Sequence, residues 1–428
     1  MDTAGGTADE EGAESGGHND LAWYMGGIWL YFISAGIQGV MFPWIITIVL
    51  HESSDRVGIA QTMMMLPMLI LTLFGGALAD RMELRSHLRR LQMMQMVPPL
   101  LLGALIYGGH LTYELMLGFG VVLGILGAYV MPTRDAMLTR VAIRSLKGNI
   151  QRAVALALSG QFLGQVGGFV IGGTAVFVGA PSLFALQSLL LGLASYTTSK
   201  LSLSPPTSVG VRRSQLHEIG EGLVVLWESD RLRPVVMMMF MSGILFMGVF
   251  MVLFPIMVRD VYHGSSPEIA LINMCFFGGI GISSFTLSRL RPIRRQGRAM
   301  MLAMCMGSCV MVLMHFGMPI YVVDGLSLCW GLAAGISMSQ SRAVVQESAS
   351  AHMRARLISA FQLGNMGGGP IGALATGYLI RWLGPLDAVL VPVGLMIVLW
   401  LSIFFFTPLW RLEAPARGHA PDASTPKS

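Results

Sequence analysis

The sequence predicts an all-helical membrane protein with twelve transmembrane helices, arranged as two pseudo-symmetric bundles of six helices each. Three observations lead to this fold class: the composition, the length of the apolar runs and an internal duplication. Hydrophobic residues make up 54% of the 428 residues, charged residues make up only 12%, and the mean hydropathy is +0.65. Because soluble proteins carry about 25% charged residues, this composition excludes an ordinary soluble domain.

The apolar residues come in long runs, most of them close to the roughly 20 residues that cross a bilayer as a helix. Short polar or basic segments separate these runs. We expect the spans at residues 22–49, 57–79, 91–109, 113–140, 152–178, 182–200, 234–258, 267–288, 299–317, 319–341, 357–380 and 386–408. The first 20 residues are acidic and lack the basic region of a cleavable signal peptide, so the first span is expected to be an uncleaved signal-anchor.

Lysines and arginines cluster in alternate gaps between the spans. The gaps within 81–90, 140–152, 200–233, 289–298 and 342–356 are rich in them, whereas the opposite set holds only Arg56, Arg259 and Arg381. Loops rich in Lys and Arg stay on the cytoplasmic side, so we expect both termini to lie inside, with the protein in the bacterial inner membrane. This asymmetry explains the pI near 9.2, so no nucleic-acid partner is expected.

The spans divide the chain into five parts. Residues 22–200 are expected to form the N-terminal bundle and residues 234–410 the C-terminal bundle. The terminal segments 1–21 and 411–428 lack the apolar residues needed to fold and are expected to be disordered. The cytoplasmic linker 201–233 contains either a short amphipathic helix on the membrane surface, within 214–229, or a plain connection.

An internal duplication supports the two bundles. Residues 163–173 read LGQVGGFVIGG and residues 363–373 read LGNMGGGPIGA, so that five positions coincide at an offset of 200. Two halves with the same order of features are typical of transporters. Small residues every four positions lie on one helix face and allow close helix packing in lipid. We therefore expect helix packing, with a role in gating, for Gly164, Gly168, Gly172, Gly364, Gly368 and Gly372, and bending of a helix at Pro370.

Three motifs carry a resemblance to a known family. The segment after the second span, GGALADRMELRSHLRR, resembles the loop pattern of the major facilitator superfamily at Gly76, Leu78, Ala79, Asp80 and Arg81, with Glu83 in place of the usual glycine. An acidic residue there is similar to the enterobactin-exporter-like branch, the transmembrane secretion effectors, which export small molecules. That branch also has the patterns matched by Pro132, Arg134 and Ala136 and by Gly367, Gly368, Gly369, Pro370 and Gly372.

The resemblance implies a role for the loop that begins at Asp80. In the superfamily this carboxylate faces the N-terminus of the eleventh helix, here near Met353 to Leu357, when the cytoplasmic side is closed. We therefore expect a conformational latch that favours the outward-open state, formed by Gly76, Asp80, Arg81, Glu83 and Arg85. The alternative is that the basic residues only set the topology. In the antiporter branches a proline follows the second glycine of the fifth helix, and Phe169 stands here instead.

The resemblance also implies a central cavity lined by helices one, two, four, five, seven, eight, ten and eleven. Polar residues on these spans are candidates for cargo binding or coupling, although each could instead bond a neighbouring backbone group: Gln38, Gln61, Arg134, Gln161, Gln165, Asn273, Asp324, Gln340, Arg342, Gln362 and Asn365. Ionisable groups inside a membrane are functional by default, so Asp324 is either a proton carrier or a solvated residue at the outer mouth. Arg134 either neutralises Asp80 or Glu347 or lies at the surface; we do not expect it to pair with Asp135, because adjacent helical residues do not face each other.

These observations predict a secondary active transporter that exports an apolar or amphiphilic small molecule, such as a drug, siderophore or lipid-like metabolite, in exchange for H⁺. The 33 methionines would suit an adaptable cavity or simply face lipid. An uptake carrier of the same fold is one alternative and a non-transporting membrane sensor is another. No GxxxxGK[ST], HExxH or GxSxG motif is present, and the cysteines fall inside spans as small buried residues, so we expect no enzyme activity, no cofactor and no metal site. We expect a monomer surrounded by lipid.

Overall fold

The N-terminal half of the chain forms the first six spanning helices. The computed structural model describes residues 6–146, 149–203, 220, 224–289, 293–348 and 354–412. The first half consists of α1 (Gly6–Trp44) with the π-helical turn η1 (Ile45–Val49), α2 (Ser54–Arg81), α3 (Leu84–Tyr107), α4 (Tyr113–Ser145), α5 (Ile150–Gly173) with the short α6 (Ala175–Val178), and α7 (Ala180–Ser199).

The C-terminal half repeats this order. It consists of α9 (Arg233–Gly248) with the π-helical turn η2 (Val249–Leu253) and α10 (Phe254–Asp260), α11 (Ser266–Arg289), α12 (Gln296–His315), α13 (Ile320–Ser348), α14 (Arg354–Leu383), the turn η3 (Asp387–Val389) with α15 (Leu390–Phe406), and η4 (Pro408–Arg411). Within the described ranges, each of the twelve predicted spans corresponds to one helix or to a helix with a short continuation. Eight of the described helices are long and apolar enough to cross a membrane by themselves.

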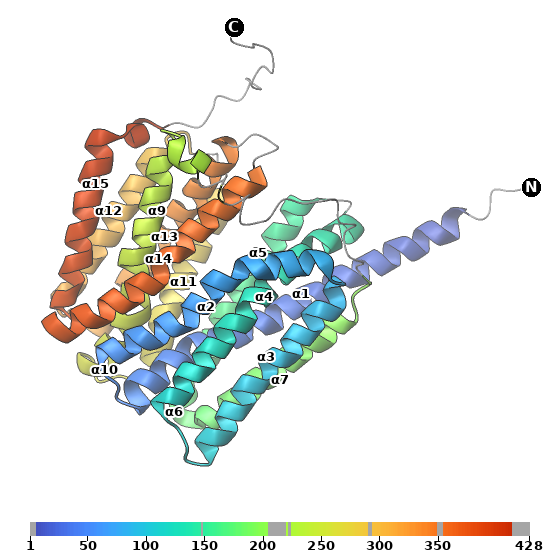
Figure 1. Ribbon diagram of the computed structural model, residues 1–428, viewed down its shortest axis with the longest axis horizontal. Coiled ribbons are helices and arrows are strands. Elements are labelled where there is room, and N and C mark those ends of the chain that lie inside the picture. The colour runs from blue at the N-terminus through green and yellow to red at the C-terminus, as the bar shows by residue number, and fades with distance from the viewer. Residues whose placement is uncertain are drawn as a thin grey trace, which may run out of the picture.

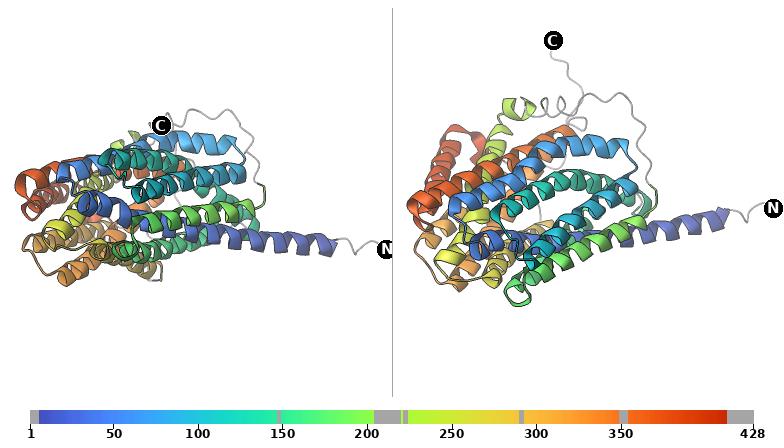
Figure 2. Two further views of the ribbon diagram at one scale, coloured as in Figure 1. Left: turned by 90° about the horizontal axis from the view of Figure 1, so that it is seen from below. Right: turned by 60° about the horizontal axis from the view of Figure 1, so that its bottom comes forward.

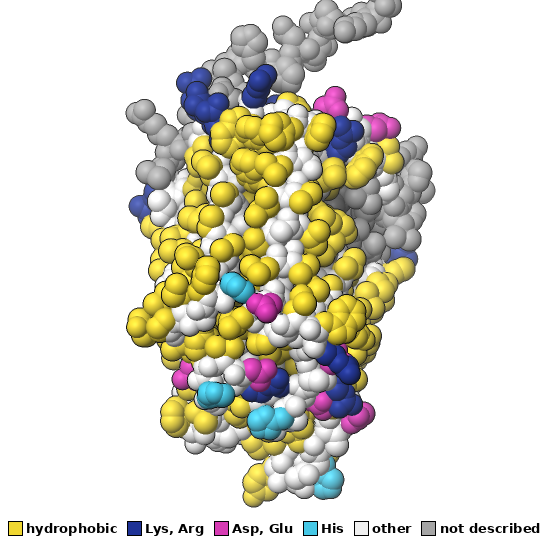
Figure 3. Space-filling model, turned by 90° about the vertical axis from the view of Figure 1, so that its left-hand side faces the viewer, with side chains coloured by type: hydrophobic (Ala, Val, Ile, Leu, Met, Phe, Trp, Pro, Cys, Tyr) yellow, Lys and Arg dark blue, Asp and Glu magenta, His cyan; other side chains and the backbone are white. Residues whose placement is uncertain are grey.

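The two halves form two groups of helices. In Figure 1 the helices from α1 to α7, blue to green, lie beside those from α9 to α15, yellow-green to red, and the two views in Figure 2 show the same division. The face seen in Figure 3 is mainly hydrophobic in its upper half; charged side chains lie at its top, and a second group of charged and histidine side chains lies in its lower half. The all-helical fold predicted from the sequence is confirmed.

Three expectations differ from the structure. Helix α1 begins at Gly6, although residues 1–21 were expected to be disordered; a helix that is already nucleated extends at little cost, because each added residue gains a hydrogen bond. The fifth span is broken at Thr174. Cys305, Cys309 and Cys329 are exposed on helix surfaces instead of buried, because a small apolar side chain can face lipid as well as a core. The predicted amphipathic segment and the segment 413–428 lie largely outside the described residues.

The glycines of the duplicated segment lie at two close contacts between helices. On α5, a Cβ atom at Gly168 would lie 2.2 Å from the carbonyl oxygen of Ile33 and 2.7 Å from Cα of Gly36, both on α1. On α14, a Cβ atom at Gly372 would lie 2.1 Å from the carbonyl oxygen of Ile244 on α9. Gly164, Gly172, Gly364 and Gly368 line the same two contacts. Each half therefore places its first helix directly against its fifth.

The close approach of α1 and α5 predicts a stability effect. Gly168→Ala is expected to destabilise the protein by about 1–3 kcal/mol, because an added methyl group overpacks the contact. Gly167→Ala is the matched control, since a Cβ atom there meets nothing within 4 Å and alanine is the better helix former. Thermal unfolding of the purified variants in detergent measures both. Equal melting temperatures for the two variants would contradict the packing described here.

Candidate functional site

One end of the molecule is formed by loops that are poor in arginine. It consists of residues 50–53, 108–112, 261–265, 316–319 and 384–389, and we call it the arginine-poor end. Hydrogen bonds connect these loops: the hydroxyl of Tyr262 donates to the carbonyl of Met318 at 2.7 Å, and Nδ1 of His315 lies 3.1 Å from the carbonyl oxygen of Leu386. The opposite end carries the basic gaps, and we call it the arginine-rich end.

The two halves contact each other in the part of the bundle next to the arginine-poor end. Helix α2 packs against α14, and α5 packs against α11. The backbones of α2 and α14 meet at Gly58 and Gly377, where a Cβ atom on Gly377 would lie 3.1 Å from Cα of Gly58. The hydroxyl of Thr62 donates to the carbonyl of Pro370 at 3.0 Å. This close contact shuts the arginine-poor end.

The three arginines that break the charge asymmetry all lie at this closure. Nη1 of Arg381 on α14 is 2.6 Å from Oδ2 of Asp55 on α2, which forms an ion pair between the halves. Arg259 donates from Nη1 to the carbonyls of Thr47 (3.1 Å) and Glu52 (2.6 Å) in the other half. Arg56 stays within the N-terminal half. Two of the three arginines therefore hold the halves together.

Further polar contacts reinforce the closure. Ser266, at the start of α11, is fully buried; its hydroxyl donates to the carbonyl of Gly173 at 3.0 Å and accepts from the backbone N–H of Val176 at 3.0 Å. Nε1 of Trp44 donates to the hydroxyl of Ser265 at 3.1 Å. Since Ser265 and Ser266 belong to one half and their partners to the other, these bonds break if the arginine-poor end opens.

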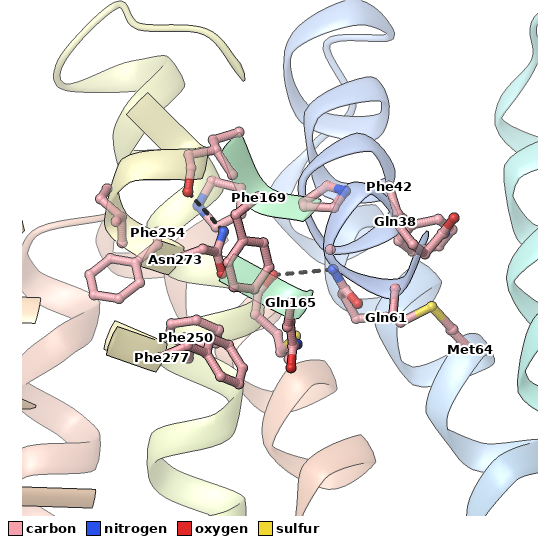
Figure 4. Close-up of a pocket in the computed structure, with 17 residues that line it drawn as sticks. Gln38, Phe42, Gln61, Met64, Gln165, Phe169, Phe250, Phe254, Asn273 and Phe277 are labelled. Carbon is pink, nitrogen blue, oxygen red and sulfur yellow. Dashed lines mark hydrogen bonds between the residues drawn. The ribbon is translucent and has the colours of Figure 1, made fainter. Parts of the chain in front are cut away.

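A cavity of about 160 Å³ lies between the halves, next to this closure. Residues of α1, α2 and α5 line it from one half and residues of η2, α10 and α11 from the other. Figure 4 shows five phenylalanines and four side-chain amides around it: Phe42, Phe169, Phe250, Phe254, Phe277, Gln38, Gln61, Gln165 and Asn273. None of the lining residues that the structure describes is charged.

The aromatic rings of the cavity contact each other across the two halves. Phe169 on α5 and Phe277 on α11 have ring centroids 5.3 Å apart, and Phe250 lies 5.8 Å from Phe277. Phe169 stands where the antiporter pattern has a proline. The phenylalanine that replaces this proline forms part of the cavity wall. Phe169 therefore belongs to the candidate site, although it does not match the antiporter pattern.

The amides differ in their bonding. Nε2 of Gln61 donates to the carbonyl of Met251 at 3.3 Å, and Nδ2 of Asn273 donates to the carbonyl of Ile269 at 2.8 Å. Oε1 of Gln38 accepts from Nε2 of Gln187 at 2.9 Å. Nε2 of Gln38 and Oε1 of Gln61 are buried and have no hydrogen-bond partner in the structure. A ligand could satisfy these atoms.

The structure brings together only part of the predicted candidate set. Gln38, Gln61, Gln165 and Asn273 line the cavity, whereas Arg134, Gln161, Asp324, Gln340 and Arg342 are not among its lining residues. Helices α4, α13 and α14, which the resemblance places around the cavity, contribute no lining residue to it among those described. The side chains of Gln362, Asn365 and Asp80 lie outside the described residues.

The predicted latch residues have local roles in this structure. The carboxylate of Glu83 accepts from the backbone N–H groups of Arg85 (3.1 Å) and Ser86 (2.7 Å) and thereby caps α3. The guanidinium of Arg85 donates to the carbonyl of Leu201 at 2.8 Å. Arg81 is exposed at the end of α2, and Gly76 is half-buried. Glu83, which stands where the family pattern has a glycine, therefore acts as a helix cap.

Arg134 is buried near the arginine-rich end of α4. Its guanidinium lies over the ring of Phe32, 4.5 Å from the centroid, and Nη2 contacts Sδ of Met131 at 3.1 Å. Nη2 lies 3.8 Å from Oδ1 of Asp135, an ion pair that we did not expect but that is too long for a hydrogen bond. The contact arises because the long arginine side chain reaches around the helix. Nη1 has no hydrogen-bond partner among the residues that the structure describes.

Asp324 on α13 is 9% exposed, and its Oδ1 has no hydrogen-bond partner in the structure. It interacts electrostatically with Cys275 and Glu268 on α11 and with Tyr262. Burial first, and the charge of Asp324 second, raise the pKa of Tyr262, which lies in the loop after α10.

Sequence reasoning missed several residues that form the closure and the cavity, above all Asp55, Arg381, Ser266 and the phenylalanines. One signal was present: Phe42-Pro43 in the first helix of one half is repeated as Phe254-Pro255 in the first helix of the other. Each pair lies beside a π-helical turn, η1 or η2. Turns of this kind inside helices are frequent at functional sites.

Comparisons with known proteins agree with this architecture. The family model described as Major Facilitator Superfamily matches residues 24–373. The multidrug efflux pump Tap of Mycobacterium tuberculosis is 26% identical over 371 residues, which cover 80% of this chain and 83% of the relative. Tap of Mycolicibacterium fortuitum is also 26% identical, over 398 residues that cover 88% and 92%. The crystal structure of the nucleoside transporter NupG superposes with a TM-score of 0.71 at 13% identity, covering 90% of this chain and 99% of that one.

Proposed function

The chain belongs to the major facilitator superfamily, and from this premise we propose that it exports an apolar or amphiphilic small molecule from the cell in exchange for protons. Membership makes it a multi-pass membrane transporter of a small molecule. The cavity between the halves supports the proposed class of cargo. Phenylalanines and amides line it without a charge among its described residues, which suits a cargo with aromatic or apolar surface.

The relatives support export as the direction. Tap, of which this chain covers most of the length, is named a multidrug efflux pump. The charge asymmetry supports an orientation with the arginine-rich end in the cytoplasm. In that orientation the structure is a state closed to the outside, in which cargo enters from the cell interior. The division into two bundles, 22–200 and 234–410, then describes the two bodies that move against each other.

The proposed cycle needs two closures. The ion pair of Asp55 with Arg381 and the contacts of Ser266 stabilise the state closed at the arginine-poor end. The latch around Asp80 would stabilise the opposite state. The glycine contacts of α5 with α1 and of α14 with α9 keep each half rigid during the exchange. The protein would work as a monomer, since one chain supplies both halves.

Accumulation of a fluorescent hydrophobic dye in cells tests this function. Cells that express the protein are expected to accumulate less dye than cells with an empty vector, and an uncoupler is expected to abolish the difference, because the proton gradient drives export. Higher accumulation in expressing cells would instead show uptake. A difference that survives the uncoupler would contradict proton coupling.

A further inference from the structure

Gln61 connects the cavity to the closure of the arginine-poor end. This residue is 2% exposed and lines the cavity from α2. Its Nε2 crosses to the other half and donates to the carbonyl of Met251 in η2, as Figure 4 shows. The next residue, Thr62, bonds the carbonyl of Pro370. Two successive residues of α2 therefore hold two different helices of the opposite half.

A proline at position 255 removes one possible backbone donor to the carbonyl of Met251. In an α-helix this carbonyl would accept from the N–H four residues later, and residue 255 is a proline without an N–H. Gly39 stands in the same relation to Pro43 in the first half, and it also lines the cavity. Each repeated Phe-Pro pair therefore removes the N–H group that an α-helix would use to bond a carbonyl beside the cavity.

The bond from Gln61 to Met251 is weak and leaves the amide half satisfied. A length of 3.3 Å exceeds the usual 2.7–3.2 Å of an N–H···O bond. Oε1 of Gln61 is buried and has no partner among the described residues, which costs free energy that a ligand donor can recover. The terminal torsion of a glutamine side chain is soft. A ligand can therefore turn the amide at little cost.

The surroundings define the chemistry of such a ligand. The described cavity wall has no charge, presents five phenylalanine rings and offers an acceptor at Oε1 of Gln61. An uncharged aromatic molecule that carries an N–H or O–H group would stack on the rings and satisfy this acceptor. A molecule of the same shape without the donor would leave this acceptor buried and unpaired.

We propose that Gln61 determines specificity for a hydrogen-bond donor on an uncharged aromatic cargo, and that binding this donor to Oε1 turns the amide away from Met251. The proposal rests on the proposed function, because it takes this cavity as the cargo site. Loss of the bond to Met251 removes one contact between the halves. Loading from the cytoplasmic side thereby weakens the closure at the arginine-poor end, which is the step that an exporter needs.

A matched pair of probes tests the proposal directly. Indole carries the donor, and 1-methylindole has the same ring system without it. We expect the full-length protein in lipid nanodiscs to bind indole about tenfold more tightly than 1-methylindole, measured by equilibrium dialysis with empty nanodiscs as the blank. In Gln61→Met, which keeps the length of the side chain without the amide, the ratio is expected to fall to about one, through weaker binding of indole alone.

Gln95→Met is the matched control. Gln95 on α3 is also a buried glutamine with an unpaired Oε1, but it does not line the cavity. This variant is expected to keep the preference for indole. A general loss of structure would weaken both probes equally and leave the ratio unchanged, so only a direct role of Gln61 in recognising the donor predicts the selective effect.

A second measurement follows the closure. The variant Ser266→Cys, made in a protein without its native cysteines, places a thiol that is buried between the halves. Indole is expected to speed the reaction of this thiol with a membrane-impermeant reagent. Addition of 1-methylindole is expected to have no such effect, and neither is addition of indole to a protein that also carries Gln61→Met. Equal binding of the two probes, no saturable binding of indole, or a preference that survives in Gln61→Met would each overturn the proposal. Neither measurement needs transport. If the protein prefers indole but does not export the dye, that result would contradict only the proposed function.

Discussion

Asp55→Asn is expected to shift the protein toward the state that is open at the arginine-poor end. The change removes the charge from the 2.6 Å ion pair with Arg381 that crosses between the halves. The side chain of Asp55 is 10% exposed and that of Arg381 is 58% exposed, so water screens part of the attraction and the pair contributes about 0.5–1 kcal/mol. We expect the open state to become about 2- to 5-fold more populated.

Thiol labelling of Ser266→Cys in whole cells measures this shift. In a background without the native cysteines, the rate of labelling by an impermeant reagent should rise in Asp55→Asn and in Arg381→Gln. The charge exchange Asp55→Arg with Arg381→Asp should restore slow labelling, because the pair forms again in reverse. Tyr107→Cys, at an 87% exposed position on the same end, controls for access. Unchanged labelling of residue 266 in both single variants would show that the pair does not hold the closure.

Asp324→Asn is expected to abolish active export of the dye while leaving the fold intact. Asp324 is a buried carboxylate on a spanning helix, one of its oxygens has no partner in the structure, and it interacts with Glu268 at the arginine-poor end. A group of this kind can bind and release a proton as its access to water changes. Asparagine has the same shape and cannot release a proton, so we expect at least about a tenfold loss of proton-driven export.

Exchange of dye across proteoliposome membranes separates coupling from folding. Asp324→Asn should lose transport driven by a proton gradient but keep exchange of labelled for unlabelled dye, because exchange needs only the conformational cycle. Asp387→Asn is the matched control, since this carboxylate lies at the same end and is 64% exposed. Uphill transport that remains sensitive to an uncoupler in Asp324→Asn would assign proton coupling to another residue.

The amino-acid sequence was sufficient to predict the fold because the bilayer imposes simple rules. Apolar runs of spanning length, the alternation of basic gaps and the repeat around Gly168 and Gly368 each follow from local chemistry, and the apolar runs predicted the twelve spans. The repeated glycines lie where α5 meets α1 and where α14 meets α9. Four of the predicted polar candidates line the cavity, because a polar side chain in a span usually faces protein instead of lipid.

The sequence was less informative wherever two distant segments meet. The pair of Asp55 with Arg381 joins positions in different halves, and each residue alone resembles an ordinary charge at a helix end. The phenylalanines of the cavity cannot be distinguished by type from those that face lipid. Asp324 and Gln340 were expected at the cavity for their polarity, but they are not among its lining residues.

The sequence by itself therefore determined the class of protein, the number of helices, the duplication and the family, because each of these depends on composition and on periodicity along the chain. Only the tertiary structure decided which end is closed, which side chains line the cavity and that Gln61 bonds Met251. These features depend on how one half lies against the other, and many such arrangements satisfy the same local rules of hydrophobicity and helix packing.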